Sequence, residues 1–189
     1  MTFSLVVACD EQRGIGKDGD MPWHLPGDMK HFRQVTQRCD QPGRQNAVVM
    51  GRRTWQSIPD KFRPLVGRVN VVLTRNSEFP LPAEVVRASD GLEAAIARLA
   101  APPLSETVGD IFVIGGGSVY VQAIAMADCR ELYVTRIHRV FDCDTSFPEF
   151  EHAFDRTASL GEGADGDVRY TFERWTRREA LGGVPIDRT

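Results

Sequence analysis

Residues 111–120 read "IFVIGGGSVY", and this stretch decides the fold class. A short run of large apolar residues ends in the triplet Gly115-Gly116-Gly117, and an apolar segment with helical character follows at once. Short apolar runs bounded by glycine are typical of buried strands. The stretch therefore predicts a strand at 110–115 and a helix at 118–127, which is the repeating unit of α/β proteins.

The glycine triplet has two interpretations. A strand that passes through glycines into a helix lets a phosphate group approach the free N–H groups of that helix. The spacing differs from the G-x-G-x-x-G dinucleotide fingerprint, because Tyr120 stands in place of the third glycine. The triplet can equally serve only to turn the chain tightly, and the stretch alone leaves both interpretations open.

The rest of the chain alternates strand and helix patterns and ends in consecutive strands. This order indicates one domain over residues 1–178, with a largely parallel sheet, helices on both faces and an antiparallel edge at the C-terminal end. The glycine-rich loop 10–24 is expected to be a lid or binding element, and residues 179–189 a poorly ordered tail. Strands are predicted at 4–9, 46–51, 68–74, 83–88, 131–140, 152–160 and 167–177, and helices at 26–37, 52–58 and 91–101.

The composition suits a globular protein without a strongly charged partner. A chain of 189 residues with 42% hydrophobic and 26% charged residues can bury a real core, and its net charge of −3 gives no indication of nucleic-acid or membrane binding. The apolar runs are too short to span a bilayer. The opening "MTFSLVVACDE" lacks a basic leader, so we expect a cytoplasmic protein. The four cysteines lack metal-ligand spacing, and no metal site is expected.

Groups that suit phosphate follow two further predicted strands. In "MGRRTW" (50–55), Arg52, Arg53 and Thr54 open a helix directly after Gly51, and "VVLTR" (71–75) ends in Thr74 and Arg75. Open α/β sheets bind ligands beyond the carboxyl ends of their strands. Each arginine alone could be an exposed surface charge. If the strand ends share one edge of the sheet, two or more phosphates of a dinucleotide would account for all of them.

An acidic residue in "MPWHLPGDMKHF" (21–32) shares a helix face with apolar side chains. Asp28 falls in the first turn, four residues before Phe32 and seven before Val35. Acidic side chains also favour helix N-termini for electrostatic reasons alone, so this stretch leaves a functional role open. Nearby, "RPLVGR" (63–68) offers arginines that could clamp a carboxylate or simply face solvent.

Together these motifs closely resemble those of the dihydrofolate reductase family. The matching stretches are "IGKDGDMPWHLPGDMKHF", "MGRRTWQSIP", "RPLVGRVNVVLTR", "VIGGGSVY", "LYVTRI", "DTSFPE" and "YTFERW". The resemblance implies an eight-stranded α/β fold and NADPH-dependent reduction of 7,8-dihydrofolate to tetrahydrofolate. It also implies a monomer that binds dihydrofolate and antifolate inhibitors, and a cis peptide bond at Gly115-Gly116.

The resemblance also implies roles for individual residues. Asp28 would bind the N3 and 2-amino groups of the pterin ring, with its pKa raised by burial. Thr135 would support Asp28, Trp23 would hold a water molecule, and the loop containing Met21 would admit the water that carries the proton. The residues implied to bind substrate are Val6, Val7, Ala8, Met29, Phe32, Ile58, Arg63, Leu65, Arg68, Ile114 and Thr135, with Arg68 on the folate α-carboxylate.

The implied cofactor site contains the groups that were singled out at the strand ends. Arg52, Thr74 and Arg75 would surround the adenosine 2′-phosphate, which predicts NADPH in preference to NADH. The full set is Ala8, Ile15, Gly16, Gly19, Gly51, Arg52, Arg53, Thr54, Leu73, Thr74, Arg75, Ile114, Gly115, Gly116, Gly117, Ser118, Val119 and Tyr120.

Two other functions compete with this one. A pyrimidine reductase of riboflavin synthesis shares the fold and the use of NADPH, but it gives no reason for the combination of Trp23, Asp28 and Arg68. A non-catalytic dinucleotide-binding module would explain the phosphate-binding groups without any chemistry.

Overall fold

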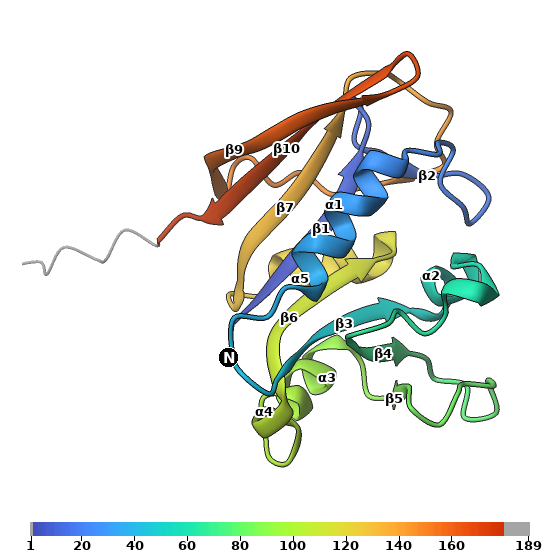
Figure 1. Ribbon diagram of the computed structural model, residues 1–189, viewed down its shortest axis with the longest axis vertical. Helices are drawn as coiled ribbons and strands as arrows, with labels where there is room; N and C mark the ends of the chain where they lie inside the picture. Colours follow the sequence, from blue (N-terminus) through green and yellow to red (C-terminus); the bar gives the residue numbers. More distant parts are fainter. Residues whose placement is uncertain (1, 180–189) are drawn as a thin grey trace, which may run out of the picture.

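Eight strands form one twisted sheet through the middle of the protein (Figure 1). Their spatial order is β5-β4-β3-β6-β1-β7-β10-β9, and neighbours are parallel from β5 through β7 and antiparallel from β7 to β9. This confirms the expected eight-stranded α/β fold with an antiparallel C-terminal edge. The strands are β1 (Phe3–Cys9), β3 (Gln45–Gly51), β4 (Val69–Leu73), β5 (Val86–Ala88), β6 (Val108–Gly115), β7 (Cys129–Ile137), β9 (Phe154–Asp165) and β10 (Val168–Arg177).

Helices cover both faces of this sheet. On one face, α3 (Leu92–Leu99) and α5 (Gly117–Ala125) pack on the larger apolar cluster, which contains Leu5, Val7 and Cys9 of β1. On the other face, α1 (Pro26–Gln37) and α2 (Arg52–Ser57) pack on a second cluster around Val6. Strand β1 therefore buries alternate residues on opposite faces, as a central strand between two helical layers must.

Four short elements were not predicted from the sequence. Strand β2 (Gly14–Gly16) lies in the loop 10–24 and pairs with β8 (Thr145–Ser146). The others are the 3-10 helix η1 (Asp60–Phe62) and α4 (Leu104–Thr107). Elements of two to four residues carry too few side chains to show a periodic pattern, so only tertiary contacts define them.

The structure is a computed structural model that describes residues 2–179. The expected tail begins at residue 179, so nearly all of it lies outside the described residues. The last described positions are tied down, because Arg178 pairs with Asp155 at 2.9 Å and its backbone N–H donates to Ala153. Within the described part of the chain, no helix is long and apolar enough to cross a membrane.

The parallel strands deliver their C-terminal residues to one edge of the sheet. In the strand register, Gly51 of β3 stands opposite Leu73 of β4, and Met50 stands opposite Gly115 of β6. On the other side of β6, Ala8 near the end of β1 stands opposite Thr135 of β7. The expectation that the chemically distinctive strand ends share an edge is therefore confirmed.

A buried asparagine connects α1 to the sheet. The Asn46 side chain is fully buried, and its Nδ2 donates to the carbonyl oxygens of Thr36 (3.2 Å) and Arg38 (2.6 Å) at the end of α1. Its Oδ1 accepts from the N–H of Asp110 in β6 (2.9 Å). One side chain of β3 thus satisfies three backbone groups, two at the end of α1 and one in β6, that would otherwise be buried without partners.

Replacing this side chain should destabilise the fold. We expect Asn46→Ala to lower the free energy of unfolding by about 2–4 kcal/mol, because buried backbone groups lose their partners. Chemical denaturation monitored by circular dichroism would measure the loss. Gln45→Ala, at the exposed neighbouring position, is the matched control and should change stability little. A loss at Asn46 no larger than the control would show that water replaces these hydrogen bonds.

Candidate active site

Asp28 is a carboxylate buried at the start of α1. Helix α1 begins at Pro26, whose missing N–H suits the first helical position, and Asp28 follows within the first turn. Only 6% of Asp28 is exposed to solvent. Thr135, itself buried on β7, lies beside it. The helix face that carries Asp28 is therefore the buried face, as the spacing with Phe32 and Val35 predicted.

The surroundings of Asp28 favour its neutral form. Burial is the main reason why the pKa of Asp28 is raised, and the negative charge of Asp165 raises it further. The Thr135 hydroxyl interacts with the carboxylate and opposes this rise. Within residues 2–179, no lysine or arginine forms an ion pair with Asp28. Such a carboxylate is suited to bind a flat ring that carries N–H donors.

Trp23 presents an unpaired polar atom close to this site. The residue is 8% exposed and packs against Phe141, with ring centroids 5.2 Å apart. Among the described residues, its Nε1 is the single buried side-chain nitrogen or oxygen without a hydrogen-bond partner. A buried indole N–H of this kind suits an ordered water molecule. Met21, two residues earlier in the loop, is 44% exposed.

Apolar side chains from several elements form a wall next to Asp28. Phe32 of α1 packs with Val6 of β1, and Ile58, Leu65 and Ile114 belong to the same cluster. Met29 is 43% exposed and is not part of this cluster, while Ala8 packs with the group around Trp23.

Val7 does not contribute its side chain to this wall. It packs in the cluster on the opposite face of the sheet, with α3 and α5. Since consecutive residues of a strand point to opposite faces, only the main chain of Val7 can face the α1 side. The prediction of Val7 as an apolar wall residue is therefore wrong for its side chain.

Arg68 is a half-buried cation without an acidic partner. Its guanidinium group donates to the Thr36 hydroxyl (2.9 Å) and lies 5.9 Å from the centroid of the Phe32 ring. No ion pair joins it to a carboxylate within residues 2–179. Burial, and then the nearby charge of Arg33, lower the pKa of Arg68 to about 10. An anionic group would relieve both effects, so this position suits a ligand carboxylate.

A polar residue that sequence reasoning missed holds the Arg68 loop. Asn70 is buried in β4, where its Oδ1 accepts from Leu65 N–H (2.9 Å). Its Nδ2 donates to the carbonyl oxygens of Leu65 (3.0 Å) and Arg68 (2.9 Å). The available signal was one polar residue inside the apolar stretch "VNVVL".

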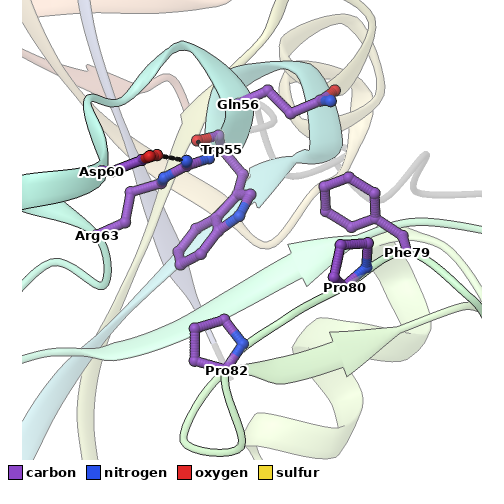
Figure 2. A pocket seen from close by; sticks show the side chains of 7 residues that line it. All are labelled: Trp55, Gln56, Asp60, Arg63, Phe79, Pro80 and Pro82. Carbon is purple, nitrogen blue, oxygen red and sulfur yellow. Dashed lines mark hydrogen bonds and ion pairs between the residues drawn. The ribbon is translucent and has the colours of Figure 1, made fainter.

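Arg63 lies in the same loop but points elsewhere. Its guanidinium group forms an ion pair with Asp60 and donates to the Trp55 carbonyl oxygen (3.1 Å). This arginine borders a hollow of about 410 Å³. Figure 2 shows the side chains that line it, which are Trp55, Gln56, Asp60, Arg63, Phe79, Pro80 and Pro82. The geometry does not support the prediction that Arg63 binds substrate, because its guanidinium group is already paired with Asp60.

The glycine triplet lies against the start of α2. The Gly115-Gly116 peptide bond is cis, as the resemblance implied, and Gly115 has a φ of 128°, a conformation that favours glycine. A Cβ added to Gly116 would lie 3.1 Å from the Thr54 hydroxyl oxygen. The main chain of the triplet is thus exposed to close approach beside a hydroxyl group and the N-termini of α2 and α5, which suits phosphate oxygens.

Three arginines near this edge have no acidic partner. Arg52, Arg53 and Arg75 form no ion pair within the described part of the chain, and Arg52 lies 5.8 Å from the centroid of the Phe79 ring. Thr74 is buried, and its hydroxyl accepts from Asn76 N–H (3.2 Å). Arginines without an acidic partner, near the main chain of the glycine triplet, are suited to bind a ligand with several phosphates.

The other predicted cofactor residues differ in how deeply they are buried. Ser118 is exposed, and Gly51, Leu73 and Ile114 are partly buried. Val119 and Tyr120 lie in the core, where the Tyr120 hydroxyl donates to the Val6 carbonyl oxygen (2.7 Å) and burial raises the Tyr120 pKa. Tyr120 thus connects α5 to the strand that carries Ala8.

The loop 10–24 covers the triplet from the other side. A Cβ at Gly117 would lie 2.7 Å from Thr145 Cγ2 and 4.0 Å from Ile15 Cδ1. Gly16 pairs with Thr145, while Gly19 lies in the exposed tip with a φ of 86°. The loop is therefore in place to contact a ligand bound at the triplet.

Asp10 anchors this loop and was not predicted. Its buried carboxylate accepts from the backbone N–H groups of Gln12 (2.9 Å), Gly14 (2.7 Å) and Phe141 (2.9 Å). It thereby joins the base of the loop to the segment that leads to β8. The sequence showed only an acid after a strand, which is compatible with many roles.

Comparisons with known proteins agree with this geometry. The sequence model for dihydrofolate reductase matches residues 2–177. The chain is 39% identical over 177 residues to the dihydrofolate reductase of Heliothis virescens, covering 90% of this chain and 94% of that protein. Its structure resembles that of Schistosoma mansoni dihydrofolate reductase with a TM-score of 0.83, at 34% identity, covering 94% of this chain and 99% of the other.

Some relatives are much longer proteins. The chain is 40% identical over 178 residues to a bifunctional dihydrofolate reductase-thymidylate synthase of Glycine max, which covers 93% of this chain and 34% of that protein. The chain thus spans about a third of the length of such bifunctional relatives. The matched region contains the buried carboxylate, the Arg68 loop and the glycine triplet together. The chain therefore belongs to the dihydrofolate reductase family.

Proposed function

We propose that this protein reduces 7,8-dihydrofolate to tetrahydrofolate with NADPH. The observation that carries the proposal is the Asp28 carboxylate, which is buried without a cationic partner among the described residues. It contacts Thr135, whose strand position lies at the same edge of the sheet as the glycine triplet. A single ligand pair accounts for both features: a heterocycle with N–H donors on Asp28, and a dinucleotide on the triplet.

Asp28 would hold the pterin ring. Its two oxygens would accept from N3–H and the 2-amino group in nearly parallel hydrogen bonds, and the Thr135 hydroxyl would orient the carboxylate. Positive charge that develops on the ring during reduction would be stabilised by this carboxylate in a site with little water. The raised pKa of Asp28 would let the site keep one proton, which would lie on the carboxyl group before reaction and on the ring, beside the ionised carboxylate, during reduction. The rate should therefore fall as the pH rises and the site loses that proton.

Trp23 would bind the water molecule that carries the proton to the substrate. Asp28, bound to N3 and the 2-amino group, would be out of reach of N5, the atom that is protonated. The unpaired Trp23 Nε1 would donate to a water molecule at the site. The loop that contains Met21, which is two residues before Trp23 and 44% exposed, would control the entry of that water.

The sheet edge would hold the cofactor, which supplies the hydride when it is bound. Ala8, Ile15 and Gly16 would contact the nicotinamide end, while Arg53, Thr54 and the start of α5 would bind the pyrophosphate. Arg52 and Arg75, which make no ion pair within residues 2–179, would surround a 2′-phosphate together with Thr74. Loss of these charge-assisted hydrogen bonds would disfavour NADH.

The apolar wall and Arg68 would bind the remainder of the substrate. Phe32, Ile58 and Leu65 would contact the aminobenzoyl ring, and Arg68 would bind the α-carboxylate at the edge of the wall. Flat antifolate inhibitors with a cationic ring would use the same carboxylate and wall. We further propose a cytoplasmic monomer.

A spectrophotometric assay separates this function from its alternatives. With NADPH and dihydrofolate, the NADPH absorbance should decay, and omitting dihydrofolate should abolish the decay. Tight NADPH binding without turnover would favour a non-catalytic module. Turnover only with a pyrimidine intermediate of riboflavin synthesis would favour the related reductase.

Asp28→Asn should impair chemistry more than cofactor binding. We expect the single-turnover hydride transfer rate at neutral pH to fall by about 100-fold or more, because an amide cannot stabilise the developing charge. Fluorescence titration should give an almost unchanged Kd for NADPH. Equal losses in both quantities would instead indicate that Asp28 maintains the structure.

Arg68→Leu should weaken folate binding by about 2–5 kcal/mol, because the ligand carboxylate would lose its cationic partner. Calorimetric titration with folate in the presence of NADPH would measure this. Arg63→Leu is the matched control from the same loop, and its Kd should stay near that of the wild type. Comparable losses in the two variants would move the carboxylate site away from Arg68.

In the ligand-free protein, the buried Asp28 carboxylate should also lower the free energy of unfolding. A folded-state pKa above the unfolded value means that stability is fully present below the ordinary pKa of 3.8 and is lost as the pH rises through the folded pKa. Asp28→Asn should therefore raise the Tm of the ligand-free protein at pH 8, and the gain should vanish near pH 3.5. The exposed Asp90→Asn should show no such dependence, and a Tm gain equal at both pH values would refute the explanation.

A further inference from the structure

The first turn of α1 is held by a residue from the far end of the chain. Leu25 precedes the helix and has no polar side chain to accept from its free N–H groups. Asp165, the last residue of β9, supplies that acceptor: its Oδ2 accepts from Gly27 N–H at 2.9 Å. The same oxygen accepts from the Tyr170 hydroxyl of β10, also at 2.9 Å.

Two glycines make this close approach possible. A Cβ on Gly27 would clash with the Tyr170 hydroxyl oxygen, and one on Gly163 would clash with the Tyr170 ring. Three residues beyond Asp28, the His31 ring stacks on Phe172 of β10, with centroids 3.8 Å apart and planes 18° apart. The start of α1 is thus pressed onto the β9–β10 hairpin.

This contact acts on the residue that follows Gly27. Several groups influence Asp28 or lie near it: Asp165 from β9, Tyr170 from β10, Thr135 from β7, Tyr120 from α5 and His31 from its own helix. Among them, Asp165 adds negative charge that, after burial, raises the pKa of Asp28. Burial and Asp165 raise the pKa of Tyr170 to about 12, so its hydroxyl stays a donor at neutral pH.

We propose that Asp165 is a positioning residue for Asp28: it fixes the first turn of α1 on the β9–β10 hairpin and places a second negative charge near the Asp28 carboxylate. Asp165 would not touch the substrate. It would act through Gly27 N–H, which sets where the Asp28 carboxylate stands, and through electrostatic repulsion across the turn. The inference rests on the proposed function only for its effect on the rate.

Asp165→Asn tests the charge while keeping an acceptor for Gly27 N–H. The first readout is the carboxyl ¹³C titration of Asp28 in the ligand-free protein, with the resonance assigned by its loss in Asp28→Asn. The second readout is the pH profile of single-turnover hydride transfer from NADPH to dihydrofolate. Asp165→Glu tests rescue by a conserved charge, and Asp165→Ser is a second neutral variant that can still cap the helix.

A matched control lies two residues further on. Asp167 is on the same hairpin turn, is exposed, and pairs with Arg139 at 3.1 Å. Asp167→Asn removes an equal charge without touching α1, so neither readout should move. A shift equal to that of Asp165→Asn would assign the effect to net charge and overturn the proposal.

The expected result for Asp165→Asn and Asp165→Ser is a shift of both midpoints to lower pH, with at least partial recovery in Asp165→Glu. The rate at pH 8 should fall several-fold, while the rate at acidic pH stays near that of the wild type. If the variants lose thermal stability but both midpoints coincide with those of the wild type, the role of Asp165 is structural and the proposal is wrong. A shifted Asp28 titration in a protein that does not turn over dihydrofolate would reject the proposed function and leave the coupling intact.

Discussion

The burial of one carboxylate without a cationic partner among the described residues is the constraint on which the site depends. An ionised group in such a place destabilises the folded chain, because the lost hydration is not replaced by an ion pair. Asp28 is tolerated because the Thr135 hydroxyl interacts with its carboxylate and because its raised pKa makes the neutral form easier to reach. The helix that carries it must then begin at a defined point, and Pro26, Gly27 and Asp165 together determine that point.

The sheet turns this local constraint into a site for two ligands. Parallel strands end along one edge, so the glycine triplet, the arginines at the start of α2 and the end of β1 become neighbours although they are far apart in sequence. The wall on the α1 side stands next to this edge and ends at Arg68. A reduced nicotinamide and a flat ring would meet where these two regions join, near Ala8 and Thr135.

Most long elements could be predicted because their signals are local. The helix at 26–37 agrees with α1 residue by residue, and the glycine triplet marks the end of β6. The sequence did not distinguish residues whose role depends on the direction in which the side chain points. Val6 and Val7 are both apolar, yet their side chains lie on opposite faces of the sheet. Arg63 and Arg68 share one loop, but Arg63 pairs with Asp60, whereas Arg68 forms no ion pair within residues 2–179. Only this difference leaves Arg68 available to a ligand carboxylate.

The sequence by itself determined the order of strands and helices, the tight glycine turn, and the presence of an acid on an apolar helix face. Each of these features depends on residues that lie close together in the sequence, within about two helical turns of one another. Only the tertiary structure decided the ionisation of that acid and the partners of its helix. Gly27 and Asp165 are 138 positions apart, and Asn46 joins three elements. Burial and long-range hydrogen bonds arise from packing, which no local pattern encodes.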